Sequence, residues 1–216
     1  MGRNIEKDAI EMADKKKRIL EQGFKIFSER TIEKVTMSDV ADAAEIGIAS
    51  LYRYYNTKQD LLLAINSWIW EDFMDNVSAD KLEGAQYDEM TGAEAFEDYL
   101  DIFIDLYLDH KDMLRFSQFF NVYLQSEDVP PEELKSFTHA VTAMGNRFLE
   151  TWGKGMRDGT LHSDMPAREV FTVTLHLMLA AATRYAVGLA YTENTDAEKD
   201  LRLLKKMLVD QFTVKK

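Results

Sequence analysis

The stretch LYRYYNTKQDLL, residues 51–62, places three tyrosines, one arginine and one lysine within eight residues. A buried element would have to supply a partner for each phenol hydroxyl and for both charges. A surface that binds a polyanion can use all five side chains, because they reach phosphates and base edges. The stretch therefore indicates a surface for a polyanion. The alternative is a tight helical corner that carries amphipathic aromatic residues at the surface.

Residue patterns for catalysis or metal binding are missing from the sequence. The chain has no cysteine, which excludes disulfides, thiol catalysis and thiolate metal sites. A di-metal helical bundle needs Glu-x-x-His pairs, and none of the four histidines has a carboxylate three residues before it. The segment GKGMRDG has the wrong glycine spacing for a dinucleotide loop, and no Gly-x-Ser-x-Gly elbow occurs. We expect no enzyme activity, no metal and no cofactor.

The charge of the chain is distributed unevenly. The net charge is −12, yet residues 1–60 hold 11 basic and 11 acidic residues, so the excess acid lies in the rest. The balanced part contains the basic run at 15–18, and residues 46–59 contain Arg53 and Lys58 without any acid. Basic charge is therefore local and flanks the tyrosine-rich stretch. For the basic run alone, a solvated helix face and a role in DNA binding are equally open.

The composition is that of a protein with a sizeable core, since 46% of the residues are hydrophobic. The N-terminus has no apolar stretch of the kind found in signal peptides. The most apolar segment, residues 170–191, is interrupted by His176 and Arg184, which disfavours a membrane span. We expect a cytoplasmic protein without a membrane partner.

Helical periodicity runs through almost the whole chain, which predicts an all-α protein of about nine helices. Two short helices are expected between 36 and 55, where Thr36 and Asp39 have capping-box spacing, as do Thr57 and Asp60. A polar connection is expected between Gly84 and Gly92. The longer helices are expected at 5–29, 58–78, 93–109, 112–126, 131–156, 167–191 and 197–213.

The two short helices have the pattern of a helix-turn-helix. Ala41 and Ala44 are small enough to let the first helix approach the second, and Gly47 can cap the second helix. Leu51 and Tyr55, four residues apart, are expected to face inward. The intervening side chains then face outward. Small residues at 49 and 50 allow close approach to a groove, and the side chains at 52–54 can reach phosphates or base edges.

With these residues the sequence resembles the TetR family of bacterial one-component transcription regulators, over residues 18–62. Beyond them only the helical layout is similar. The resemblance implies a DNA-binding domain at 1–57 and an effector-binding and dimerisation domain at 58–216. It also implies a roughly palindromic double-stranded operator. The motif is carried by Leu51, Tyr52, Tyr54, Tyr55, Lys58, Leu61 and Leu62. The expected DNA-binding residues are Thr36, Gly47, Ile48, Ala49, Ser50, Tyr52, Arg53, Tyr54 and Lys58.

Four positions depart from the family pattern. Glu45 stands where the family usually has glycine, and Gly47 where it often has a serine hydroxyl that binds phosphate. Ala49 replaces a common glycine, and Ile48 replaces a frequent polar residue. These departures keep a second interpretation open, namely a helical carrier or scavenger of small molecules that no longer binds DNA.

The remainder of the chain is rich in aromatic residues and methionine at helical spacing. Ordinary core packing explains such residues one by one, whereas as a set they are typical of a ligand pocket between helices. The resemblance to the family implies such a pocket for a small hydrophobic effector. The candidate residues are Phe103, Tyr107, Phe116, Phe119, Phe120, Tyr123, Phe137, Met144, Phe148, Trp152 and His176.

The last two predicted helices are apolar on more than one side, so one side needs a further partner. Leu201, Leu204 and Leu208 form one seam, which Leu203 and Met207 widen. Together with the resemblance, this pattern favours a homodimer through these helices. The sequence as a whole indicates a ligand-responsive transcriptional regulator, most simply a repressor that a small apolar or aromatic effector releases from its operator.

Overall fold

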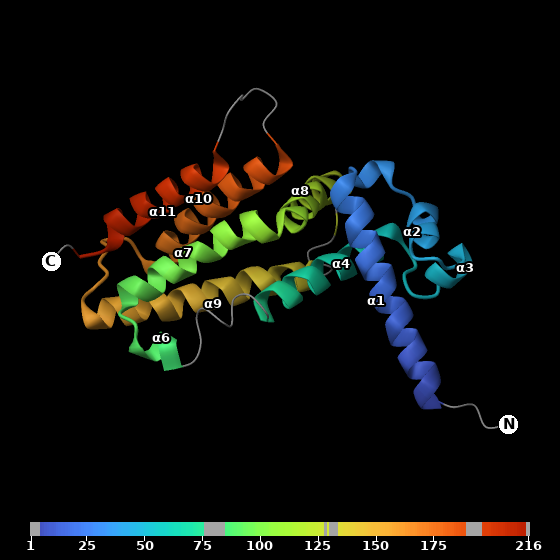
Figure 1. The fold of residues 1–216 in the computed structure, drawn as a ribbon, viewed down its shortest axis with the longest axis horizontal. Helices are drawn as coiled ribbons and strands as arrows, with labels where there is room; N and C mark the ends of the chain where they lie inside the picture. The colour runs from blue at the N-terminus through green and yellow to red at the C-terminus, as the bar shows by residue number, and fades with distance from the viewer. Residues whose placement is uncertain (1–4, 76–84, 128, 130–133, 189–195, 215–216) are drawn as a thin grey trace. The chain divides into compact units, whose positions relative to one another are not determined.

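The computed structural model describes residues 5–75, 85–127, 129, 134–188 and 196–214. This part of the chain is helical, as predicted, apart from loops and one isolated antiparallel bridge between Leu161 and Thr213. The elements, labelled in Figure 1, are α1 (Ile5–Glu29), the 3-10 helix η1 (Ile32–Lys34), α2 (Met37–Ala43), α3 (Ile48–Leu51), α4 (Lys58–Phe73), α6 (Ala85–Glu89), α7 (Gly92–Asp109), α8 (Lys111–Ser126), α9 (Lys135–Asp158), α10 (Ala167–Val187) and α11 (Ala197–Phe212).

The described residues contain ten α-helices, whereas the sequence predicted about nine. The additional helix is α6, which has five residues and lies within the segment predicted as a polar connection. The predicted end of the 167–191 helix was also wrong, because α10 ends at Val187. Gly188 follows with φ of 106°, a conformation that a non-glycine residue rarely adopts. Residues 76–78 of the helix predicted at 58–78 lie outside the described residues.

The chain divides into two compact units. Unit 1 comprises Met1–Ile69 and Phe116–Phe137, and unit 2 comprises Trp70–Arg115 and Thr138–Lys216. Helices α4 and α8 each contribute residues to both units. This division describes compactness, whereas the predicted boundary at residue 57 separates a DNA-binding from an effector-binding function. That boundary stays a prediction.

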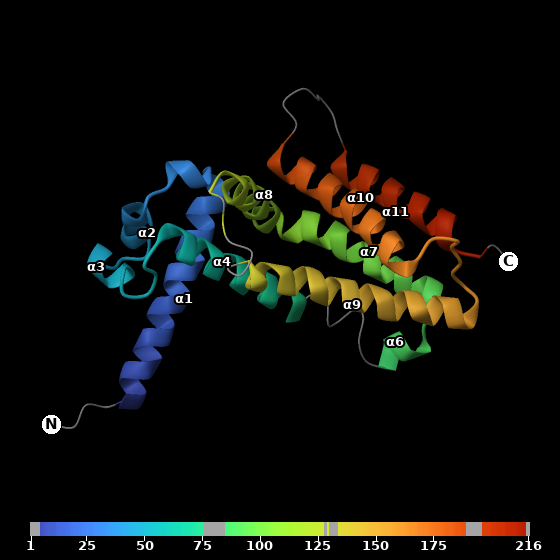
Figure 2. The same cartoon turned by 180° about the vertical axis from the view of Figure 1, so that it is seen from behind.

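Unit 1 is built around α1. This helix packs against α2, and α2 packs against α3. A Cβ atom added at Gly23 of α1 would lie 2.8 Å from Cδ1 of Ile65, so α4 approaches α1 closely at this point. Residues 9–17 of α1 are exposed, and Figures 1 and 2 show the N-terminal half of α1 extending away from α2 and α3.

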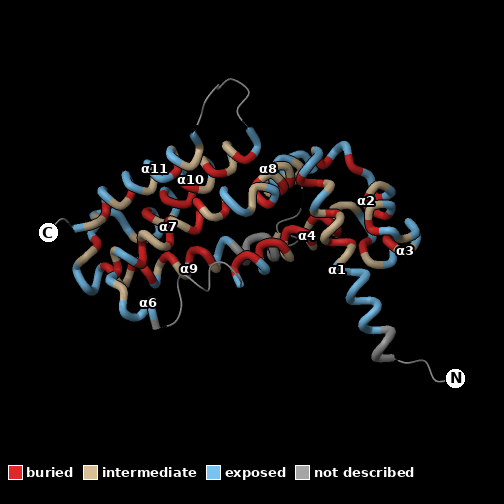
Figure 3. Tube along the Cα trace, in the orientation of Figure 1, coloured by how far each residue is buried: buried red, intermediate tan, exposed pale blue. Residues whose placement is uncertain are grey.

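Unit 2 has an aromatic core between α7, α9 and α11, with α10 packed on α7 and α11. The ring of Phe96 lies 6.2 Å from Phe148, 5.8 Å from Trp152 and 6.2 Å from Phe212. Figure 3 shows the buried residues of these helices in red, on the sides that face one another. These edge-to-face contacts join residues that lie 52, 56 and 116 positions apart in the sequence.

Helices α7 and α9 meet closely at a pair of glycines. A Cβ atom at Gly92 of α7 would lie 2.0 Å from Cα of Gly155 in α9. The N-terminus of α7 is also held by polar contacts. The amide of Gly92 donates to Asp158 over 2.7 Å, and the amide of Ala93 donates to the Thr160 hydroxyl over 3.0 Å. The beginning of α7 and the end of α9 are therefore locked together by backbone contact and by hydrogen bonds.

Candidate functional site

The first short helix of the predicted motif begins at a complete capping box. The backbone N–H of Asp39 donates to the Thr36 hydroxyl over 3.2 Å, and the Asp39 carboxylate accepts from the Thr36 amide over 2.7 Å. Hydrogen bonds from the Thr36 hydroxyl and then the Thr36 amide lower the pKa of Asp39. The capping prediction is confirmed. The structure thus engages Thr36, an expected DNA-binding residue, in holding α2.

The turn between α2 and α3 explains why glycine is usual at position 45 in the family pattern. Glu45 has φ of 54°, and it is the one described non-glycine residue with positive φ. This conformation brings the amide of Ile46 back to the carbonyl of Ala41, over 3.0 Å. A side chain in the left-handed region costs about 1 kcal/mol relative to glycine. The departure at position 45 therefore places strain in the turn that sets the angle between α2 and α3.

Helix α3 presents the predicted side chains to solvent. Leu51 is fully buried and Tyr55 is 6% exposed, so the prediction that they face inward is confirmed. Ile48 and Tyr52 are 40% and 47% exposed, and Ala49 and Arg53 are exposed as well. The remaining members of this stretch, Ser50 and Tyr54, are half-buried. One face of α3 is therefore anchored in the core, and the other is open for contact.

Two polar side chains, one on α3 and one in the turn that follows it, are already paired with each other. Nη2 of Arg53 donates to the hydroxyl of Ser50 over 3.1 Å. Gly47 is the N-cap of α3, as predicted, but it has no side chain to cap the helix. Nothing lies within 4 Å of a Cβ atom at this glycine. The α3 surface thus has a guanidinium held in position and an open N-terminal end.

Lys58 has an internal partner that the sequence did not reveal. Its half-buried ammonium donates to the carbonyl of Ile32, the first residue of η1, and lies 5.7 Å from the ring centroid of Phe27. Burial lowers the pKa of Lys58. The helix that Lys58 starts is capped by Thr57 and Asp60, with both reciprocal hydrogen bonds at 3.0 Å, as their spacing predicted. Lys58 therefore ties α4 to η1, and a contact with phosphate stays a prediction.

The candidate effector residues are divided between the two units. Phe116, Phe119, Phe120 and Tyr123 belong to unit 1, and Phe103, Tyr107, Met144, Phe148, Trp152 and His176 belong to unit 2. The side chain of Phe137 lies outside the described residues. In unit 2, Phe148 and Trp152 stack at 5.6 Å within the aromatic core, whereas His176 is exposed on α10. An effector-binding role for this set remains a prediction.

In unit 1 one of the aromatic candidates, Phe116, contacts a phenylalanine of α1. The ring of Phe24 lies 5.8 Å from Phe116 and 6.4 Å from Trp68, and Phe116 stacks on Phe120 at 5.8 Å. These contacts bring α1, α4 and the second half of α8 together. Sequence reasoning placed the α8 residues with the effector domain and the Trp68 end of α4 beneath them, but it did not identify Phe24 as a neighbour.

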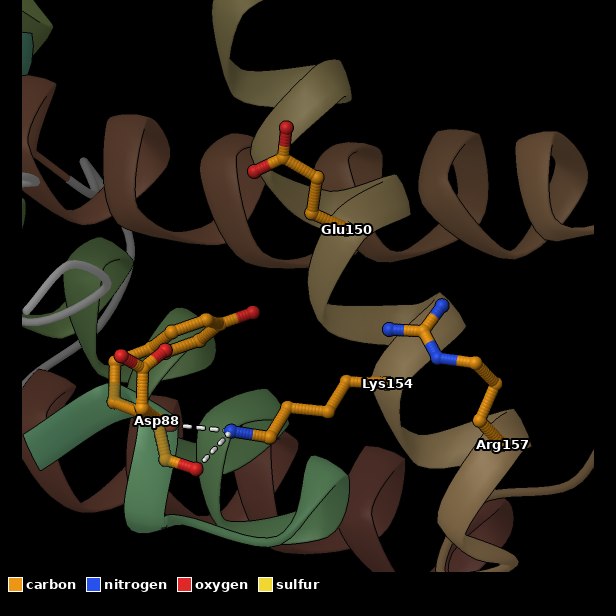
Figure 4. A pocket seen from close by; sticks show the side chains of 5 residues that line it. Asp88, Glu150, Lys154 and Arg157 are labelled. Atoms are coloured by element: carbon orange, nitrogen blue, oxygen red, sulfur yellow. Dashed lines mark hydrogen bonds between the residues drawn. The ribbon is translucent and has the colours of Figure 1, made fainter. Parts of the chain in front are cut away.

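A polar pocket of about 380 Å³ lies in unit 2, lined by Tyr87, Asp88, Glu150, Lys154 and Arg157. Figure 4 shows Glu150, Lys154 and Arg157 extending from α9, and Asp88 from α6. The Lys154 ammonium donates to the carbonyls of Tyr87 and Asp88, and lies 4.4 Å from the ring centroid of Tyr87. Lys154 therefore caps the last turn of α6, which gives this pocket a structural explanation.

Helices α10 and α11 expose apolar side chains at helical spacing. Val173 and Leu177 of α10 are 42% and 45% exposed, and Leu203 and Met207 of α11 are 55% and 60% exposed. In contrast, Leu201 and Leu208 of the predicted seam are buried within the chain. Helix α10 is also long and apolar enough to cross a membrane, by length and composition only.

Comparisons with known proteins agree with this architecture. Residues 19–65 match the model of the family described as bacterial regulatory proteins, tetR family. No curated protein matches the chain. Among solved structures, a transcriptional regulator from Saccharomonospora viridis in complex with choline is 15% identical, with a TM-score of 0.77 over 94% of this chain and 100% of that chain.

Two further solved structures have the same fold. The regulator FadR from Bacillus subtilis in complex with stearoyl-CoA is 16% identical, with a TM-score of 0.69 over 89% of this chain and 96% of that chain. AibR in complex with isovaleryl coenzyme A and operator DNA is 16% identical, with a TM-score of 0.68 over 90% of this chain and 98% of that chain. The chain thus has the helix-turn-helix region of the tetR family model at residues 19–65, and its all-helical fold is that of these solved regulators.

Proposed function

We propose that the protein is a ligand-responsive transcriptional repressor, which binds a roughly palindromic operator as a homodimer and leaves it when a small effector binds. The observation that carries this proposal is the division of α3 into a buried face and an exposed face. Leu51 fixes the helix in the core, while Ile48 and Ala49 lie on its open side and the exposed Tyr52 and Arg53 follow its last residue. A short helix presented in this way fits the major groove, where its side chains reach base edges and phosphates.

The proposed dimer interface is the exposed apolar face of α10 and α11, defined by Val173, Leu177, Leu203 and Met207. These four side chains are 42–60% exposed, and a second copy of the chain would remove their apolar surface from water. Two copies related by a two-fold axis would present two α3 helices to one face of the duplex. The centres of the half-sites are then about 34 Å apart, or a multiple of this distance.

The effector is proposed to be small and largely apolar. Support comes from the aromatic side chains of α7, α8 and α9, and from solved structures of this fold that hold stearoyl-CoA or isovaleryl coenzyme A. Helix α4 is the proposed link to DNA, because it begins at Lys58 beside η1 and its last residues belong to unit 2. An effector that favours one position of α4 by 1–3 kcal/mol would weaken operator binding roughly 5- to 150-fold.

The test of DNA binding uses the intergenic DNA beside the gene, titrated with protein at several salt concentrations. We expect tight binding to a fragment that contains an inverted repeat, and a loss of tenfold or more in Arg53→Ala, from about 1–3 kcal/mol per specific contact. Arg157→Ala, which removes an exposed arginine of unit 2, is the matched control. Equal binding of parent and Arg53→Ala at every salt concentration would contradict the proposed interface.

The test of the dimer uses Leu203→Glu combined with Met207→Glu. Like charges facing each other across a two-fold axis cost several kcal/mol, so we expect dimer dissociation to be favoured by about 100-fold or more. Leu108→Glu alters an exposed leucine of α7 and serves as the control. A folded double variant that remains a dimer by sedimentation would exclude this interface. If the parent protein stays in solution only in detergent, the apolar face of α10 would instead contact a membrane.

The alternative function is a carrier or scavenger of small molecules without DNA binding. The departures at positions 45, 47 and 49 favour it, because they alter the turn and the residues nearest to DNA. If no genomic fragment is retained while an apolar ligand binds, the carrier interpretation is the better one.

A further inference from the structure

The side-chain amide of Asn66, in unit 1, is buried and has no hydrogen-bond partner among the described residues. Asn66 of α4 is 1% exposed, and neither its Oδ1 nor its Nδ2 atom finds a partner among the described residues. The residues one turn away, Leu62 and Ile69, are buried and apolar. The amide therefore has buried apolar neighbours on its own helix, and none of the described residues pairs with its acceptor or its donor.

A group of this kind destabilises the folded protein, since a buried amide loses its bonds to water and gains none. Leucine has nearly the same shape and would fill the position without that cost. Buried polar groups in native structures are nearly always satisfied, so an exception points to strain or to a missing partner. The backbone at Asn66 lies within a regular helix, and the described residues place no strain there.

We propose that Asn66 is the polar anchor of the effector, and that the effector carries a neutral amide on an apolar body. This inference rests on the proposed function and specifies its ligand. An amide offers one acceptor and one donor side by side, which match the donor and the acceptor of the asparagine side chain. A charged head group fits less well, because a neutral amide does not compensate for the loss of hydration of an ion.

The position of Asn66 also gives the ligand direct access to the helix that contacts the helix-turn-helix unit. Asn66 and Lys58 are eight residues apart on α4, which corresponds to about 12 Å along the helix. Lys58 donates to the carbonyl of Ile32, and Ile65 packs closely on α1 near Gly23. All of these residues belong to unit 1. A ligand bound to Asn66 therefore acts on α4 within the unit that contains α3.

The first test measures thermal stability without ligand. Asn66→Leu should raise Tm by roughly 2–4 °C or more, because it removes an unpaired buried amide and keeps the branching of the side chain. The matched control is Asn121→Leu, which replaces an exposed asparagine of α8 and should leave Tm nearly unchanged. If Asn66→Leu fails to fold, Asn66→Ala provides the same comparison. A Tm of Asn66→Leu at or below that of the parent would mean that the amide is already satisfied, and it would overturn the proposal.

The second test measures binding of decanamide and methyl decanoate, which share an apolar chain and differ in the amide donor. The parent should bind decanamide at least about tenfold more tightly than the ester, because the ester leaves the carbonyl of Asn66 unpaired. Asn66→Leu should bind the two probes equally, while Asn121→Leu keeps the preference of the parent. Failure of the parent to bind or to prefer decanamide would overturn the proposed head group.

A titration of operator DNA with and without decanamide separates this inference from the proposed function. If the parent binds operator but decanamide binds without discrimination by Asn66, the inference fails and the regulator stands. If decanamide binds through Asn66 but no DNA is bound, the proposed regulator fails and the ligand chemistry stands.

Discussion

The two units treat their buried interior differently. In unit 2, Phe96 contacts three other aromatic rings, and Gly92 meets Gly155 backbone to backbone. In unit 1, Asn66 and the hydroxyl of Tyr55 are buried without a described partner, as is the hydroxyl of Thr174 in unit 2. Unit 1 also holds Glu45, the one described non-glycine residue with positive φ. Local features that lower the stability of a protein tend to cluster at its functional sites. The comparison therefore indicates that unit 2 is packed for rigidity, and that unit 1 retains costly features beside the proposed binding surface.

The largest expected effect tests the packing of unit 2. Gly92→Ala would place Cβ 2.0 Å from Cα of Gly155, where neither backbone can move freely because Asp158 and Thr160 bind the start of α7. We expect a loss of about 3 kcal/mol in the free energy of unfolding, which is the upper part of the range for overpacking. Urea titrations followed by circular dichroism measure it.

The control for this substitution is Gly153→Ala, in α9. The Cβ atom there would meet only the end of the flexible Arg157 side chain, at 3.2 Å. Alanine is the better helix former by about 0.5–1 kcal/mol, so this variant should be slightly more stable than the parent. If both variants had the stability of the parent, the close crossing of α7 and α9 would be wrong.

Local features of both units could be predicted from the sequence. The capping pairs Thr36–Asp39 and Thr57–Asp60 depend on residues three apart, and the inward positions of Leu51 and Tyr55 depend on helical spacing. These contacts form within one or two turns, so the order of residues nearly determines them.

Contacts between distant residues could not be predicted. Gly92 was interpreted as the end of a loop, and nothing in the sequence links it to Gly155. Lys58 was expected to face DNA, whereas its partner is a backbone carbonyl 26 residues away, a type of acceptor that every residue has. His176 lies on a helix that is apolar all round, so its exposed position depends on which side of α10 packs against α7 and α11.

The next effect in size concerns the polar connection in unit 1. Lys58→Met keeps most of the apolar stem of the side chain and removes the ammonium that Ile32 accepts from. We expect a loss of about 1–2 kcal/mol in the free energy of unfolding, because a partly buried carbonyl loses a charged donor. Lys34→Met, at an exposed position in η1, should have little effect.

The salt dependence of DNA binding distinguishes the two roles of Lys58. If its ammonium remains on Ile32 in the complex, Lys58→Met leaves the slope of log affinity against log salt unchanged. A slope lower by about one would show that Lys58 also neutralises a phosphate. Unchanged stability together with a lower slope would contradict the structural role described above.

A smaller effect of opposite sign is expected at the turn. Glu45→Gly relieves a left-handed conformation and should stabilise the protein by about 1 kcal/mol, less the entropy that glycine adds to the unfolded chain. Glu45→Ala retains a Cβ atom and should not stabilise. Thermal melts of the two variants measure the difference, and equal Tm values would show that the turn is unstrained. Operator affinity of Glu45→Gly then reports whether the angle between α2 and α3 depends on this residue.

The smallest expected effect compares two buried tyrosines, one in each unit. The hydroxyl of Tyr99 in unit 2 donates to the carbonyl of Met144 over 3.4 Å, whereas that of Tyr55 has no described partner. Tyr55→Phe should therefore leave stability unchanged or raise it by about 0.5 kcal/mol, and Tyr99→Phe should lower it by about 0.5–1 kcal/mol. Burial raises the pKa of both phenols, that of Tyr55 to about 12.

Because the pKa values of both phenols are raised, the effect of these substitutions on stability should change with pH in a defined direction. A phenol whose pKa is higher in the folded state stabilises the protein fully below the unfolded value, about 10, and loses that contribution as pH rises through the folded value. The parent should lose stability from pH 10 to 12, and Tyr55→Phe should lose less. Unfolding measured by urea at pH 8 and pH 11 tests this. If Tyr55→Phe and Tyr99→Phe lowered stability equally at pH 8, the hydroxyl of Tyr55 would have a partner, and the contrast between the units would disappear at this position.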